Sequence, residues 1–190
     1  YLPAEKAVLT GSPIRKELLA GNKEAAYTLC NFPEERKPVL LIIGGSTGSK
    51  AINEAVRNIL PQLLAKFHVI HLCGKGNVDT QLEGKPGYAQ FEYVSKELTD
   101  MFALADLAIS RAGANAICEL VALRKPNILI PLSAAASRGD QILNARSFEK
   151  QGFSYVIQEE DVTDTLLLEA VQKVYENKQT YVDAMASSGQ

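Results

Sequence analysis

The chain has 190 residues, of which 20 are basic and 22 acidic, so its formal net charge is −2. Because no basic run interrupts this balance, the general electrostatic signature of a nucleic-acid-binding protein is excluded. The hydrophobic share of 46% is typical of a soluble globular protein, long enough for one core and too short for two full-sized α/β domains. No apolar run approaches the ~18 residues of a membrane span, and the cysteines have neither zinc-site nor disulfide-framework spacing. We therefore expect a cytosolic globular domain with buried thiols.

Short apolar runs predict β-strands, and the segments between them have the apolar spacing of α-helices. The strands are nearly apolar throughout, which favours burial on both faces and hence a parallel sheet covered by helices. The fold class is α/β, a Rossmann-like doubly wound parallel sheet. The expected strands are 39–43, 69–72, 88–94, 107–110, 127–131 and 154–157, and the expected helices are 51–67, 97–105, 114–123, 141–151 and 163–175.

The order of the predicted strands and helices divides the chain into three parts. Residues 1–36 are expected to form an edge segment that joins the domain, with a strand-like piece at 7–10 and a short helix in "KELL". Residues 37–178 are expected to form the Rossmann-like domain, and residues 179–190 a C-terminal tail. In such sheets ligands bind at the carboxyl ends of the strands, so the loops at those ends are the places to look for a site.

The loop "GGSTGS" follows the first predicted core strand and leads into a helix. Glycines such as Gly45 allow positive φ and close approach of a ligand, and Ser46 offers a hydroxyl beside free helix N–H groups. The loop therefore fits a phosphate-binding turn, and equally a turn that only caps a helix.

The loop "SRAGANAICEL" delivers a second small-residue turn to a helix. Backbone N–H groups at Ala114, Asn115 and Ala116 would be exposed at the helix start. Glu119 lies within the first two turns, where the helix dipole favours a carboxylate. It either stabilises the helix start or accepts hydrogen bonds from the two adjacent hydroxyls of a ribose.

Two further loops carry polar side chains beside a strand end or a turn. In "SRGDQILNA", the side chains of Asp140, Gln141 and Asn144 offer a mixed donor and acceptor set to a polyhydroxylated ligand; the alternative is a helix cap followed by solvated side chains. In "GSPIR", Arg15 follows a rigid turn and is either a surface arginine or an anion contact. His68 and His71 have no third ligand nearby in sequence, so packing roles are expected for them.

Together these motifs resemble the MurG family of peptidoglycan glycosyltransferases. "LTGSPIR", "LLIIGGSTGSKAIN", "HLCGKG", "SRAGANAICEL" and "SRGDQILNA" occur in the family's order and extend over essentially all of the chain. The resemblance implies one half of a GT-B enzyme, the C-terminal domain that binds the donor UDP-N-acetylglucosamine. The N-terminal domain, which in the family binds the lipid-linked acceptor and contacts the inner face of the membrane, would be missing.

Residue by residue, the resemblance implies a donor site built by several loops. Gly45 and Ser46 would contact the diphosphate, and Arg15 the same region of the nucleotide. Val94 would hold the uracil through its backbone. Ala114, Asn115 and Ala116 would face the phosphates and sugar, Glu119 would bind the ribose, and Asp140, Gln141 and Asn144 would lie near the N-acetylglucosamine. At Asp140 the chain departs from the family, which often has a glutamine there, so an amide becomes an acceptor-only carboxylate.

The implied function is donor binding in an inverting N-acetylglucosaminyltransferase that converts lipid I to lipid II, without metal or cofactor. The catalytic residues are not identified, because the base is expected in the missing N-terminal domain, so this chain alone would bind donor without transferring sugar. The full-length protein would be cytoplasmic and peripheral on the inner membrane face. Two alternatives stay open: another GT-B-type UDP-sugar enzyme, such as a UDP-N-acetylglucosamine 2-epimerase, and a non-catalytic subunit that docks a partner.

Overall fold

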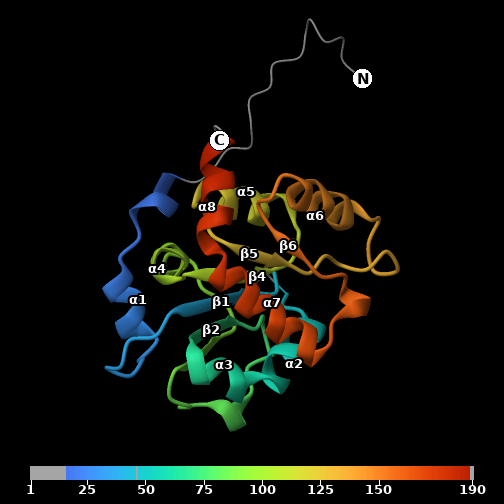
Figure 1. The fold of residues 1–190 in the computed structure, drawn as a ribbon. Helices are drawn as coiled ribbons and strands as arrows, with labels where there is room; N and C mark the ends of the chain where they lie inside the picture. The colour runs from blue at the N-terminus through green and yellow to red at the C-terminus, as the bar shows by residue number, and fades with distance from the viewer. Residues whose placement is uncertain (1–15, 46, 189–190) are drawn as a thin grey trace, which may run out of the picture.

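The structure, a computed structural model, describes residues 16–45 and 47–188 (Figure 1). Its centre is a six-stranded sheet in the order β3-β2-β1-β4-β5-β6, and every neighbouring pair is parallel. This confirms the predicted α/β class. The strands are β1 Val39–Ile43, β2 His68–Leu72, β3 Tyr88–Phe91, β4 Leu107–Ser110, β5 Asn127–Leu129 and β6 Tyr155–Val156.

Helices cover both faces of the sheet, because successive strand residues point to opposite faces and are apolar on both. In β1, Leu41 belongs to one buried cluster and Leu40 and Ile42 to the other. The first cluster includes residues of α1 Lys23–Leu29, α4 Glu97–Leu104, α5 Ala114–Ala122, α6 Asp140–Lys150 and α8 Lys178–Ser187. The second includes residues of α2 Lys50–Asn58, α3 Leu60–Lys66 and α7 Asp164–Glu176. The sheet is therefore doubly wound, as predicted.

Three strands are shorter than predicted and one predicted helix is broken, whereas the other predicted elements differ by at most one residue at either end. The strands predicted at 88–94, 127–131 and 154–157 are shorter and end before their last predicted residues. The helix predicted at 51–67 is broken between α2 and α3, where Pro61 occupies the first turn of α3. Proline has no N–H to donate and its ring displaces the carbonyl four residues earlier, so the first helix cannot continue through it.

The described parts of both segments that flank the sheet domain pack against it. Residues 16–20 form the 3-10 helix η2 Lys16–Ala20, in the place where a short helix was expected, and Leu18 is buried. Two helices were not predicted: α1, whose Tyr27 is buried, and α8, whose Met185 is buried in the core. The predicted strand at 7–10 lies outside the described residues, and the division at residues 36 and 178 stays a prediction.

The order of the strands locates the place where a ligand would bind. The chain leaves β1 toward β2 and β3 on one side, and then returns to β4, β5 and β6 on the other. The loops after β1 and β4 therefore diverge, and in open α/β sheets ligands bind in the crevice at this switch point. Those predicted site residues after β1, β4 and β5 that the structure describes lie in loops or in the first two turns of helices at this edge.

Candidate functional site

The carboxyl ends of β1 and β4 lie side by side at the switch point, where their loops begin. The backbone N–H of Arg111 donates to the carbonyl of Ile43 at 3.4 Å. Beyond this contact, Gly113 occupies the N-cap position of α5 and has no side chain with which to cap the first N–H groups of that helix. Among residues 16–45 and 47–188, a Cβ added at Gly113, or at Gly45 in the loop after β1, would meet no atom within 4 Å. The crevice thus has open space on both sides and backbone N–H groups of Ala114, Asn115 and Ala116 at the start of α5, a favourable place for an anion.

The loop after β1 is held firmly on its other side by backbone packing. Gly48 has φ +76°, and a Cβ there would lie 2.0 Å from the carbonyl oxygen of Cys73. A Cβ on Gly74 would in turn lie 2.4 Å from the backbone of Gly48. Ser49 then caps α2 by accepting a hydrogen bond from the N–H of Ile52 at 3.3 Å. The glycines of "GGSTGS" therefore have different roles, since Gly48 makes room for the neighbouring loop and Gly45 faces open space.

We predict that Gly48→Ala destabilises the fold and that Gly45→Ala does so less. Both residues have positive φ, which costs an alanine roughly 1–2 kcal/mol, but only at Gly48 must the backbone of the neighbouring loop also move. Urea denaturation of the two variants measures the difference in the free energy of unfolding. Equal losses would show that the contact between Gly48 and Cys73 relaxes at no cost.

Gln141 and Asn144 on α6 fasten the loops after β4 and β5 together. The side-chain oxygen of Gln141 accepts from the backbone N–H groups of Ala112 at 3.2 Å and Leu132 at 3.1 Å. The amide nitrogen of Asn144 donates to the carbonyl of Ala112 at 3.1 Å. These contacts fix the orientation of both side-chain amides, so Gln141 directs its NH2 group, and Asn144 its oxygen, away from these backbone partners. The two predicted sugar contacts thus also build the site.

Arg111 is a buried residue of the site edge that was not predicted. It directly follows β4, is 8% exposed and forms an ion pair with Glu159. Its guanidinium also donates to the hydroxyl of Ser49 at 2.6 Å and to the carbonyl of Ile130 at 3.1 Å. The only sequence signal was an arginine placed between a buried strand and a glycine turn, in "SRAGA". Its partners come from distant segments, which no local pattern reveals.

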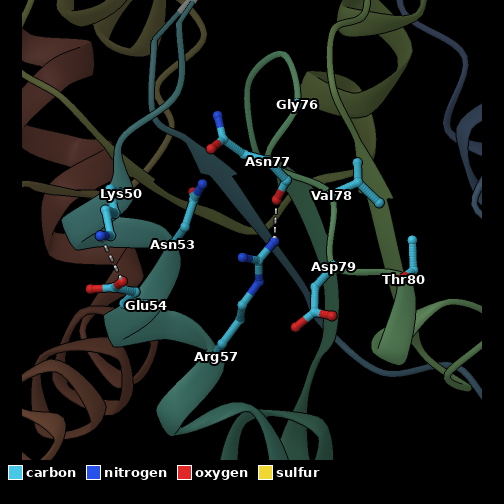
Figure 2. A pocket seen from close by; sticks show the side chains of 9 residues that line it. All are labelled: Lys50, Asn53, Glu54, Arg57, Gly76, Asn77, Val78, Asp79 and Thr80. Atoms are coloured by element: carbon cyan, nitrogen blue, oxygen red, sulfur yellow. Dashed lines mark hydrogen bonds and ion pairs between the residues drawn. The ribbon is translucent and has the colours of Figure 1, made fainter.

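A polar pocket of about 360 Å³ lies between α2 and the loop after β2 (Figure 2). Arg57 anchors this loop, since its guanidinium donates to the carbonyl of Asn77 at 2.6 Å and to the side chain of Gln90 at 3.1 Å. Lys50 and Arg57 are matched there by Glu54 and Asp79, so the lining carries balanced charge. The lining residues are Lys50, Asn53, Glu54, Arg57, Gly76, Asn77, Val78, Asp79 and Thr80.

His71 lies beneath that loop in a fully bonded buried network. Its Nε2 is 2.9 Å from the side-chain oxygen of Asn53, and its Nδ1 is 2.8 Å from the hydroxyl of Tyr88. The amide nitrogen of Asn53 donates to the carbonyl of Cys73 at 2.9 Å, so its oxygen faces His71 and accepts from Nε2–H. Nδ1 then accepts from Tyr88, and the ring is neutral. Burial, together with the nearby charge of Arg57, lowers the pKa of His71 to about 3. A packing role is confirmed.

This network predicts a loss of stability in mild acid. The unfolded histidine binds a proton below its ordinary pKa of about 6.5, whereas folded His71 stays neutral down to a pKa of about 3. The stabilisation is thus complete above pH 6.5 and declines as the pH falls toward 3. From pH 7 to pH 5 the chain should lose about 2 kcal/mol more than its His71→Gln variant. Parallel urea titrations of the two proteins check this, and identical pH slopes would contradict it.

The remaining predicted residues that the structure describes are Val94, Glu119 and Asp140. Val94 lies half-buried in the loop after β3, two strands from β1, and Glu119 lies half-buried in the second turn of α5. Asp140 is exposed at the first position of α6. Arg15 and Ser46 lie outside the described residues. Their ligand roles stay predictions.

Other chemistry predicted from the sequence can also be compared with the described residues. Among residues 16–45 and 47–188, no group of three or more His, Cys, Asp or Glu side chains is arranged to hold a metal ion. Within the same ranges, no helix combines the length and apolar character needed to cross a bilayer. Cys30 and Cys73 are buried free thiols, as expected, whereas Cys118 is only partly buried because it lies near the exposed start of α5.

Known proteins resemble the chain over its whole length. It is 64% identical over 190 residues to the UDP-N-acetylglucosamine--N-acetylmuramyl-(pentapeptide) pyrophosphoryl-undecaprenol N-acetylglucosamine transferase of Lachnoclostridium phytofermentans, and covers 53% of that protein. The protein of the same name from Lachnospira eligens is 60% identical, again with 53% covered. The chain therefore spans about half the length of the curated relatives it matches.

Solved structures show the same fold at lower identity. The crystal structure of Acinetobacter baumannii MurG matches this chain with a TM-score of 0.69 at 22% identity. The match includes 96% of this chain and 52% of the MurG chain. The structure of the glycotransferase of kitacinnamycin has a TM-score of 0.69 at 21% identity, and the match includes 82% of this chain and 39% of that protein. These structures are glycosyltransferases of the predicted fold. The model of the glycosyltransferase family 28 C-terminal domain matches residues 39–190, and the chain belongs to that family.

Proposed function

We propose that this chain binds UDP-N-acetylglucosamine as the donor domain of a MurG-type transferase. The observation that carries the proposal is the 64% identity to a relative named for that transfer, which extends over the entire chain. The crevice supports it, since Gly45 and Gly113 border open space among the described residues and Gly113 directly precedes α5 without a capping side chain of its own. We place the diphosphate there, beside the predicted contact Ser46.

The reaction we propose belongs to a longer protein. The acceptor hydroxyl of a lipid-linked muramoyl sugar attacks the anomeric carbon, the bond to UDP breaks, and the configuration inverts. Negative charge that develops on the leaving UDP is stabilised by the N–H groups and dipole of α5, which replace a metal ion. The base and the acceptor site come from another part of the protein, which also makes the membrane contact. The 190-residue chain therefore binds donor without transferring it.

Calorimetric titration of the chain with UDP-N-acetylglucosamine, UDP-glucose and UDP tests this proposal. We expect the tightest binding for the N-acetylated sugar nucleotide, and no effect of a chelator on any of the three. Preference for another UDP-sugar would favour a different GT-B enzyme. Failure to bind any uridine nucleotide would favour a docking subunit, and turnover of lipid I by the chain alone would contradict the assignment of catalysis to the missing part.

A further inference from the structure

Glu159 connects the sheet edge beyond β6 with the candidate site. It belongs to the 3-10 helix η4 Glu159–Asp161, which follows the last strand. One carboxylate oxygen pairs with the guanidinium of Arg111, and the other accepts from the backbone N–H of Ser133 at 3.1 Å. Ser133 lies in the loop that leads from β5 to α6. A residue distant from the predicted motifs therefore holds one of the site loops directly.

Through Arg111 the same carboxylate also reaches the loop after β1. The guanidinium nitrogen that pairs with Glu159 also donates to the hydroxyl of Ser49, the cap of α2, at 2.6 Å. The other terminal nitrogen donates to the carbonyls of Ile130 at 3.1 Å and Pro131 at 3.3 Å. One continuous series of contacts thus links the loop after β1 to the loop after β5.

The ion pair between Arg111 and Glu159 is largely shielded from water, so its strength depends on the positions of its partners. The side chains of Arg111 and Glu159 are 10% and 19% exposed, so their attraction is screened far less than that of a surface pair. Each oxygen of Glu159 has a different partner. In a neutral amide one of these two oxygens is replaced by an NH2 group, which cannot accept a hydrogen bond, so one of the two donors loses its partner. Glu159 therefore adds a second connection, through Ser133, to the link that Arg111 makes between the two loops.

We propose that Glu159 is a positioning residue that sets the spacing between the phosphate-side and sugar-side loops of the donor site. This inference rests on the proposed function. The phosphates are expected beside the loop after β1 and the sugar beside the start of α6, so loss of the carboxylate misplaces both. The uracil is expected at Val94, beyond the opposite side of β1, and its contacts are independent of Glu159.

The test compares Glu159→Gln with Glu160→Gln, an exposed neighbour in the same turn. Calorimetry of each variant uses uridine, UDP and UDP-N-acetylglucosamine, well below the melting temperature. Glu159→Gln should weaken UDP-N-acetylglucosamine and UDP by about tenfold and leave uridine unchanged, since one buried donor loses its acceptor. Glu160→Gln should match the unaltered chain. Glu159→Asp keeps the charge and should recover part of the loss.

Amide hydrogen exchange provides a readout that needs no ligand. In Glu159→Gln, exchange at Ser133 and Ile52 should accelerate relative to Glu160→Gln, because both amides lie at the ends of the linked series. Unchanged exchange, unchanged affinities, or equal weakening of all three ligands would each overturn the inference. If the unaltered chain binds no uridine nucleotide, the proposed function fails, and the exchange data alone decide whether Glu159 links the loops.

Discussion

Arg111→Met should lower the free energy of unfolding by about 3–5 kcal/mol, the usual cost of removing one partner of a buried ion pair. The variant leaves the carboxylate of Glu159 without its charged partner, and the carbonyls of Ile130 and Pro131 without their donor. Methionine fills most of the space, so the loss reflects charge and hydrogen bonding more than packing. Urea denaturation of both proteins, followed by circular dichroism, measures it.

Arg146→Met is the matched control, because Arg146 lies exposed on α6. Its effect should stay within about 0.5 kcal/mol, as for most surface substitutions. Adding Glu159→Gln to Arg111→Met should recover part of the stability, since the uncompensated charge is then gone. A loss below about 1 kcal/mol in the single variant would mean that water reaches Glu159 and solvates it without Arg111.

Glu119→Ala should weaken UDP binding by about 1.5–3 kcal/mol, the contribution of a hydrogen bond to a charged group. Glu119 lies half-buried in the second turn of α5, beyond the N–H groups that face the crevice. A carboxylate there can accept from both ribose hydroxyls at once. Titration of the variant with UDP measures the change, which corresponds to roughly a tenfold to 150-fold rise in Kd.

Because Glu119 also has an interaction within the chain, the stability of the variant is measured beside its affinity. Glu119→Gln keeps the size and one acceptor oxygen and should lose less affinity than Glu119→Ala. Glu169→Ala, at an exposed position on α7, should leave UDP binding unchanged. An unaltered Kd for Glu119→Ala would leave Glu119 as a helix-start carboxylate without a ligand role.

The sheet could be predicted from the sequence because its signal is local and strong. Val39–Ile43 is apolar at every position, and only a strand buried on both faces requires that pattern. The small-residue turns after β1 and β4 were also readable, since glycines and helix starts follow directly on strands. The break at Pro61 was missed because apolar spacing continues through it, although proline disrupts the helical backbone.

The contacts that hold the site together could not be predicted in the same way. Arg111 and Glu159 are 48 residues apart, and each alone reads as an ordinary surface charge. Arg57 in α2 also reads as a surface charge in the sequence, because its partner Asn77 lies 20 residues away in the loop after β2. Helix α8 was missed as well, because only Met185 among its residues is deeply buried and the apolar spacing is correspondingly weak. Tertiary partners, and not local propensity, determine these features.

The bonds of Gln141 have a consequence for ligand selection. Its oxygen is already occupied by two backbone N–H groups, at 3.2 and 3.1 Å, so the amide cannot rotate to exchange its donor and acceptor ends. A ligand that meets this side chain therefore finds a fixed polarity and must offer an oxygen lone pair. Immobilising a free side chain on binding costs about 0.5–1.5 kcal/mol. Because Gln141 is already ordered when the chain folds, a ligand that binds it does not incur this cost.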